Sequence, residues 1–160
     1  MVRPIALALL LAALCSVFGG CVSVSQTSAP TPAPTPAPTL SPRYPVERLP
    51  LPEGSVVGSA TAIVDGDKQS EYLVITLPMK KSEAISYFKP LLEKDAEFYT
   101  ESESDIVPLE IQGAYPDAKH QVELFARYAG ESALSVMRVN IFMPADGDAV
   151  TAVQIQLTYR

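Results

Sequence analysis

Apolar and polar residues alternate with a period of two in the C-terminal part of the chain, which is the pattern of a β-strand. The alternation is clearest in residues 150–159. One face of this stretch holds Val153, Ile155, Leu157 and Tyr159, and the other holds Gln154, Gln156 and Thr158. The pattern predicts a strand with one buried face and one wet face.

Two earlier stretches, residues 55–64 and 71–77, are rich in β-forming residues and are separated by Asp65-Gly66-Asp67. Because Gly and Asp tolerate the backbone angles of tight turns, the three segments predict a β-hairpin. The second stretch is apolar on one face (Leu73, Ile75, Leu77) and mixed on the other (Tyr72, Val74, Thr76). Neither face is strongly polar, so this strand is expected inside the sheet.

Between residues 82 and 94 the period changes to that of a helix, because the apolar residues Ala84, Ile85, Phe88, Leu91 and Leu92 recur at spacings of three and four. Ser82 is the expected N-cap, and the Glu83 carboxylate suits the positive end of the helix dipole. Pro90 removes one backbone donor, which predicts a kink or break near Lys89. The apolar stripe is expected to contact the core.

The segments after this helix predict further strands. Residues 97–100 and 106–111 suit strands on either side of an acidic run, residues 101–105, which is expected to be a solvated turn. Pro108 cannot donate a ladder hydrogen bond, so it places the second of these strands at an edge or bulge.

Residues 120–128 fit two structures. Their alternation favours a strand, whereas Asp117 and Gly130 stand where a helix would have its N-cap and C′ residues. We prefer the strand, because Gly130-Glu131-Ser132 would then turn directly into the next one, residues 134–143. A second Asp-Gly-Asp, at residues 146–148, leads into the final strand.

Together these elements predict an α+β domain of residues 46–160, an antiparallel sheet with one amphipathic helix packed on one face. Residues 22–45 differ in composition, and between Pro30 and Thr39 proline alternates with Ala and Thr. Such a tract forms neither helix nor sheet, so it predicts a disordered, extended linker with a reach of roughly 70 Å. A proline-rich docking ligand and an O-glycosylated stalk are the alternatives.

The N-terminus carries Arg3, an apolar stretch over residues 5–18, and then Gly19-Gly20-Cys21. The apolar stretch has the length of a secretory signal and is short for a bilayer span of about 20 residues. Residues 18–21 resemble the lipobox of a bacterial lipoprotein precursor, although Phe18 replaces the usual Leu or Val. The resemblance covers residues 1–21 only.

This resemblance implies cleavage of a signal peptide (residues 1–20) and acylation of Cys21, for example with palmitate. Residues 21–45 then link a membrane anchor to the domain. The protein is expected at the cell membrane or the outer membrane, with its domain on the extracytoplasmic side of the cell envelope. The alternatives are an unmodified Cys21 thiol and an uncleaved helical anchor. Cys15 is not a candidate, because the bulky Leu14 precedes it.

Charge limits the partners. The chain has a net charge of −6 and a pI near 4.7, and removal of Arg3 with the signal would bring the charge to −7. An acidic chain without a basic cluster is a poor partner for nucleic acid or anionic lipid headgroups. Membrane contact is therefore expected through the anchor alone.

Few residues are of the types that catalyse reactions or bind metals. His120 is the one histidine and is expected to be structural or solvent-facing, and a mature chain with one modified cysteine cannot supply the usual zinc ligands. No catalytic motif appears, so we expect a protein that is not an enzyme and uses no cofactor. The two Asp-Gly-Asp turns supply hard oxygen donors and would bind calcium together if they met at one end of the sheet: Asp65, Asp67, Asp146 and Asp148.

The sequence therefore favours a lipid-anchored, non-catalytic binding or assembly domain that contacts an envelope protein. The alternative is a small-ligand receptor or an enzyme whose site lacks a local motif.

Overall fold

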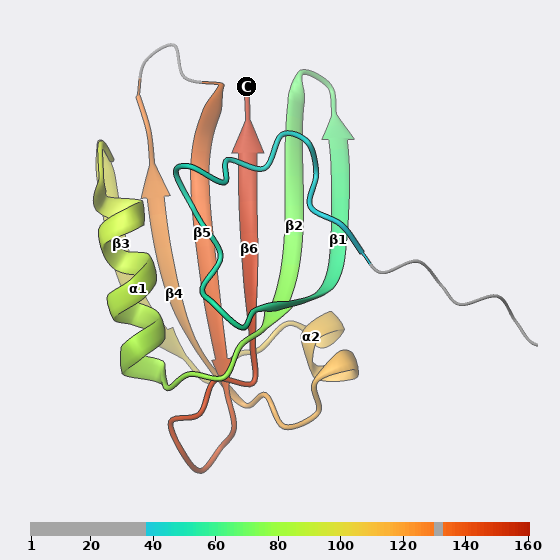
Figure 1. Ribbon diagram of the computed structural model, residues 1–160, viewed down its shortest axis with the longest axis vertical. Helices are drawn as coiled ribbons and strands as arrows, with labels where there is room; N and C mark the ends of the chain where they lie inside the picture. The colour runs from blue at the N-terminus through green and yellow to red at the C-terminus, as the bar shows by residue number, and fades with distance from the viewer. Residues whose placement is uncertain (1–37, 130–132) are drawn as a thin grey trace, which may run out of the picture. The chain divides into compact units, whose positions relative to one another are not determined.

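The computed structural model describes residues 38–129 and 133–160, which form one antiparallel sheet and two helices. The elements are, in chain order, β1 (Val56–Asp65), β2 (Lys68–Thr76), α1 (Lys81–Glu93), β3 (Phe98–Ser104), α2 (Leu109–Ala114), β4 (His120–Arg127), β5 (Leu134–Met143) and β6 (Ala152–Tyr159). The six strands lie in the order β1-β2-β6-β5-β4-β3 (Figure 1). The predicted α+β class is confirmed.

The last strand, β6, lies between the two parts of the sheet. It pairs with β2 of the first hairpin on one side and with β5 of the β3-β4-β5 meander on the other. Its alternation is confirmed, since Val153, Ile155 and Leu157 are buried and Gln154 and Gln156 are half-buried. Because β2 has neighbours on both sides, its predicted interior position is also confirmed.

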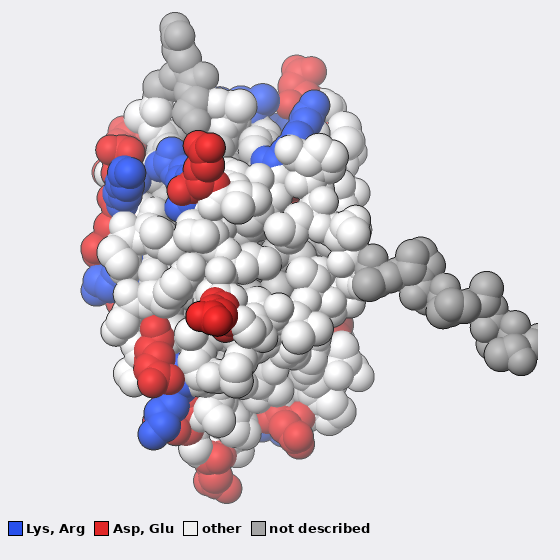
Figure 2. All heavy atoms as spheres, in the orientation of Figure 1, with Lys and Arg blue, Asp and Glu red and all other residues white. Residues whose placement is uncertain are grey.

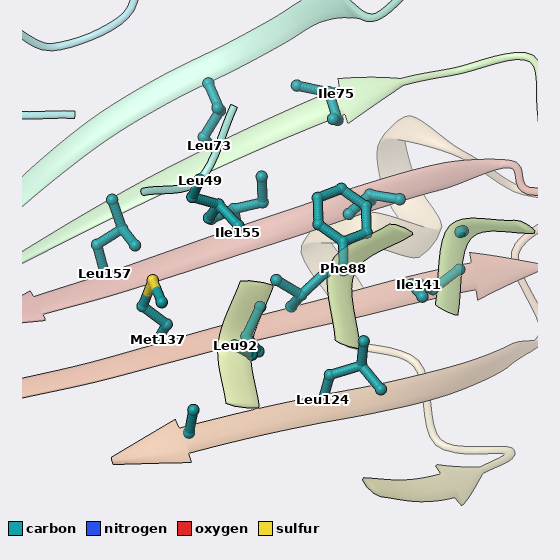
Figure 3. Packing of buried hydrophobic residues seen from close by; sticks show 14 of the residues in the cluster. Leu49, Leu73, Ile75, Phe88, Leu92, Leu124, Met137, Ile141, Ile155 and Leu157 are labelled. Carbon is teal, nitrogen blue, oxygen red and sulfur yellow. The ribbon is translucent and has the colours of Figure 1, made fainter. Parts of the chain in front are cut away.

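Helix α1 covers the β4 and β5 side of one sheet face. Its stripe packs against the sheet as predicted: Ala84, Phe88 and Leu92 are fully buried, and Ile85 and Leu91 pack against the same cluster. Figure 3 shows Phe88 and Leu92 pointing from α1 toward the strands. This face forms the main core of the domain.

Residues 38–55, which we call the strap, cross the same face over β2 and β6 (Figure 1). Leu49 is fully buried and Tyr44 nearly so, and Leu40 packs against the core. The strap is tied to α1 through the Tyr87 hydroxyl, which donates to the Pro50 carbonyl at 3.1 Å. Packing thus includes residues that we expected in the linker before Val46, because the sheet face is wider than one helix can cover.

Two predictions for residues 101–111 are wrong. The acidic run is not a turn, because Glu101 and Glu103 lie within β3 and face α1. They form ion pairs with Lys89 and Lys81 at 3.2 and 2.7 Å. The expected strand at 106–111 is instead a loop followed by α2, which begins directly after Pro108 and buries Ile111.

The ends of the elements show smaller differences. Helix α1 begins at Lys81, and Ser82 is not its cap; the Lys80 backbone N–H donates to the Glu83 carboxylate at 2.8 Å. The helix is not broken near Lys89 but continues through Pro90 to Glu93. Residues 120–127 are a strand, as preferred, while the expected turn at 130–132 lies outside the described residues.

Replacing Phe88 by Ala tests the core. We expect Phe88→Ala to lower the free energy of unfolding by about 3–5 kcal/mol, because the ring is fully buried and leaves a cavity. Chemical denaturation of a soluble fragment of residues 38–160 measures the change. Ser86→Ala, at an exposed position of the same helix, is the control and should leave the midpoint almost unchanged. Equal midpoints for the two variants would contradict the packing of α1.

Candidate functional site

The sheet face opposite α1, here called the open face, is only partly covered. At the end that lies lowest in Figure 1, α2 and its flanking loops pack on the sheet and form a second, smaller core. That core consists of Val74, Val107, Ile111, Ala118, Phe142 and Ala152, with Tyr115 against it. Among the described residues, no helix covers the remainder of this face, which is lined by polar and aromatic side chains from β2, β6, β5, β4 and β3.

A row of polar side chains crosses the open face through four neighbouring strands. Gln156 donates from Nε2 to the Tyr72 hydroxyl at 3.1 Å and accepts at Oε1 from Arg138 Nη1 at 3.3 Å. Arg138 Nε lies 3.1 Å from Glu123 Oε2. We call these four residues the polar strip. Each side chain of the polar strip contacts its neighbour in the row.

Aromatic rings continue the polar strip toward the β3 edge. The Arg138 guanidinium lies 5.3 Å from the centre of the Phe125 ring, which meets Phe98 edge to face at 6.2 Å. Arg127 lies 5.5 Å from the Phe98 ring centre. Contacts of this kind combine apolar area with a cation held over a π face. The surface beside the polar strip therefore consists of planar groups, namely aromatic rings and guanidinium groups.

Next to the polar strip, Asn140 is only 7% exposed. Its Nδ2 donates to Gln154 Oε1 at 3.2 Å, but its Oδ1 is a buried acceptor without a partner among the described residues. Gln121 Oε1, on β4, is a second such acceptor. Both atoms have less than 1 Å² of exposed surface. A buried acceptor without a partner costs about 1–3 kcal/mol of stability.

A pocket of about 180 Å³ lies between the strap and the strands β1, β2 and β6. Glu71, at its floor, is almost fully buried and accepts from the Ser41 hydroxyl at 2.8 Å. Burial, together with the Glu71 carboxylate, raises the pKa of Tyr159 to about 12. Tyr159 therefore stays protonated and donates to the Arg43 carbonyl at 3.1 Å. These contacts hold the strap on the sheet, and the space is small compared with ligand pockets of about 300–1,000 Å³.

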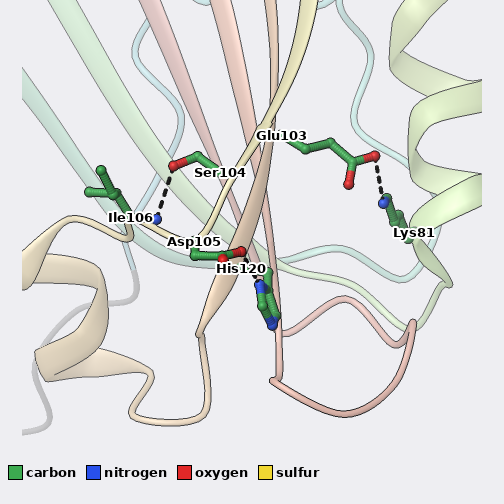
Figure 4. A network of polar contacts seen from close by, with 6 residues as sticks. All are labelled: Lys81, Glu103, Ser104, Asp105, Ile106 and His120. Atoms are coloured by element: carbon green, nitrogen blue, oxygen red, sulfur yellow. Dashed lines mark hydrogen bonds and ion pairs between the residues drawn. The ribbon is translucent and has the colours of Figure 1, made fainter.

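His120 is the first residue of β4 and lies at the opposite end of the sheet from the strap contacts. It lines a shallow pocket of about 130 Å³. Its Nδ1 is 2.6 Å from Asp105 Oδ1, and the side chain is 41% exposed (Figure 4). The nearby Ser104 hydroxyl accepts from the Ile106 backbone N–H at 2.9 Å. The histidine side chain is thus partly exposed and lies within hydrogen-bond distance of Asp105.

The two Asp-Gly-Asp turns do not meet. The β1-β2 turn lies at the end of the sheet where Gln69 pairs with Tyr159, whereas the second turn precedes the start of β6, where Ile75 pairs with Val153. Asp65 and Asp67 are therefore separated from Asp146 and Asp148 by the length of a strand, and the hypothesis of a shared calcium ion is wrong. Within the described residues no cluster of three metal-ligating side chains occurs.

Cys21, the predicted lipidation site, lies outside the described residues. The polar strip was not identified from the sequence. The one available signal was the wet face of Gln154, Gln156 and Thr158, which predicts solvent exposure but not the neighbours on other strands. On the α1 and strap side, by contrast, Figure 2 shows mainly uncharged atoms, with an acidic group near the middle and charges of both signs around the rim.

The chain matches no family model, no curated protein and no solved structure. Neither of the helices in the described ranges is long and apolar enough to cross a membrane. Fold and surface together define the class of the domain: an antiparallel α+β domain with one face closed by a helix and a strap and the other face open and polar.

A substitution at Asn140 tests whether the unpaired acceptor on the open face lowers the stability of the domain. We expect Asn140→Leu to leave the free energy of unfolding unchanged or to raise it by up to about 1 kcal/mol, because it removes the unpaired acceptor. Asn140→Asp should instead destabilise the domain, since Glu123 lies directly opposite on β4. Denaturation midpoints of the soluble fragment distinguish the two. If Asn140→Leu is as destabilising as Asn140→Asp, Asn140 has a structural role.

Proposed function

We propose that this protein is a lipid-anchored, exported binding protein whose open face contacts a protein partner in the cell envelope. The observation that carries the proposal is the polar strip with the aromatic rings beside it. Together they provide polar groups and aromatic area on the part of the open face that no described helix covers. Side chains that already contact one another lose less entropy on binding, so this face is suited to recognition.

The anchoring part of the proposal rests on the sequence. Two slim residues before Cys21, after an apolar stretch of signal length, have the lipobox pattern, and the proline-rich linker follows. The strap follows this linker in the sequence and packs on the sheet. The domain is thereby held at the end of an extended tether, which gives the open face access to partners at a distance from the membrane.

A non-catalytic role is supported by how the reactive side chains are used. The His120 ring and Asp105 pair with each other in solvent, and Glu71 serves the strap. The strap pocket is the feature that favours the alternative, a receptor for a small ligand. Its volume of about 180 Å³ would admit only a very small molecule.

Partner capture tests the role of the open face. We expect Arg138→Ala to reduce the amount of envelope protein that co-purifies with the tagged lipoprotein by about tenfold, because it removes a guanidinium that joins Gln156, Glu123 and Phe125. Lys68→Ala, which removes an exposed positive charge at the start of β2, away from the polar strip, is the control. Undiminished capture by Arg138→Ala, at matched membrane levels, would exclude the open face as the contact surface.

The anchor is tested by Cys21→Ala. Each buried CH₂ of an acyl chain contributes about 0.8 kcal/mol to membrane binding, and the acidic domain offers no compensating basic cluster. We therefore expect the variant to leave the membrane fraction while its domain stays folded. Fractionation followed by immunoblotting measures the distribution, with Cys15→Ala as the control that should stay anchored. Membrane retention of a processed Cys21→Ala protein would refute lipid anchoring.

A further inference from the structure

Strand β1 forms one edge of the sheet, and no described residue pairs with its outer side. It is ten residues long and carries no charge from Val56 to Val64. Three of its large apolar side chains are strongly exposed: Val56 at 64%, Ile63 at 51% and Val64 at 72%. A long, uncharged edge strand is a template for pairing with another strand.

The opposite edge, β3, is different in kind. It carries Glu101 and Glu103, whose ion pairs with Lys89 and Lys81 join this strand to α1. Charged side chains on an edge strand discourage pairing with another chain. The two edges therefore differ, and only β1 has the composition of an interface.

The sequence of β1 indicates which strand it fits. About Ala60 it is nearly a palindrome in side-chain type, with Ser59 mirrored by Thr61 and the apolar Val56-Val57 mirrored by Ile63-Val64. A two-fold axis through Ala60, perpendicular to the sheet, places each strand antiparallel to its copy. In that arrangement Ala60 lies opposite Ala60, and Ser59 lies opposite Thr61.

The β-bulge in β1 changes which residues pair on the N-terminal side of Ser59. The register with β2 shifts between Val57 and Ser59, at Gly58. A side chain at position 58 would require Tyr115 to move, because its Cβ would lie 2.8 Å from the Tyr115 hydroxyl. When the same one-residue shift is applied to the pairing of β1 with its copy, exposed Val56 of one copy lies opposite Ile63 of the other, on the same face of the sheet. Cross-strand pairs of β-branched residues are favourable, and so are Ser–Thr pairs.

We propose that β1 pairs with β1 of a second copy of this protein, antiparallel and centred on Ala60, to form one continuous sheet across the dimer. The two-fold axis is perpendicular to the sheet, so the open faces of both copies lie on the same side. The polar strip is then presented twice on one surface. Pairing of one strand buries a modest area, and anchoring of both copies in one membrane raises their effective concentration.

The register gives a sharp cross-linking test. In full-length protein in native membranes, Ala60→Cys should form a disulfide between copies on mild oxidation, because the two Cβ atoms face each other across the axis. The matched control is Ala62→Cys, on the same strand and the same face, where the two positions are about 14 Å apart. We expect about tenfold more cross-linked dimer from Ala60→Cys than from Ala62→Cys. The unaltered chain gives the background from its native cysteines.

A charge exchange supplies an independent test. Ala60→Lys should reduce co-purification of two differently tagged full-length copies, because like charges meet at the axis, and Ala60→Glu should do the same. Mixing Ala60→Lys with Ala60→Glu should restore it. The same charge on the other edge, Thr100→Lys, should have no effect. Equal cross-linking at positions 60 and 62, or unchanged association of Ala60→Lys, would overturn the proposal.

Discussion

The apolar face of the sheet is the constraint on which the rest of this domain depends. Strand β6 lies at its centre, and Val153, Ile155 and Leu157 continue the apolar rows of β2 and β5 on either side. Six strands side by side form a face wider than one helix, so α1 covers only part of it. The strap covers the rest with Leu49 and Tyr44, which is why the chain must be ordered well before the first strand.

The sequence predicted those elements whose pattern depends on one buried face. The strands at β1, β2, β4, β5 and β6 and the stripe of α1 were all identified, since alternation and the helical period follow directly from burial. The errors lie where tertiary contacts override the local pattern. By sequence alone, the acidic Glu101 and Glu103 suit a solvated turn. In the structure they lie in a strand, where they form ion pairs with lysines of α1. By its sequence, Ile111 suits a strand equally well. It lies in a helix because α2 covers one end of the open face, where Ile111 is buried in the second, smaller core.

The candidate site could not have been predicted from one sequence, because its parts come from different strands. Arg138 meets Gln156 and Phe125 only once β5 is known to lie between β6 and β4. The same argument explains the wrong calcium hypothesis. Two identical turns suggest one site, but β6 runs antiparallel to β2 and so begins at the end of the sheet where β2 finishes, far from the β1-β2 turn.

In the proposed function, the two faces of the sheet divide stability from recognition. The closed face holds the larger of the two buried apolar clusters, and the polar strip belongs to neither, so substitutions on the polar strip change the surface without opening a cavity. The strap joins the two roles, because it is part of the closed core and also the continuation of the linker. Its contacts, Ser41 with Glu71 and Tyr159 with the Arg43 carbonyl, lie near the start of the strap, next to Leu40, which packs against the core. Because Glu71 lies on β2 and Tyr159 on β6, these hydrogen bonds join the strap to strands that have a partner on both sides, and not to the unpaired edge of β1.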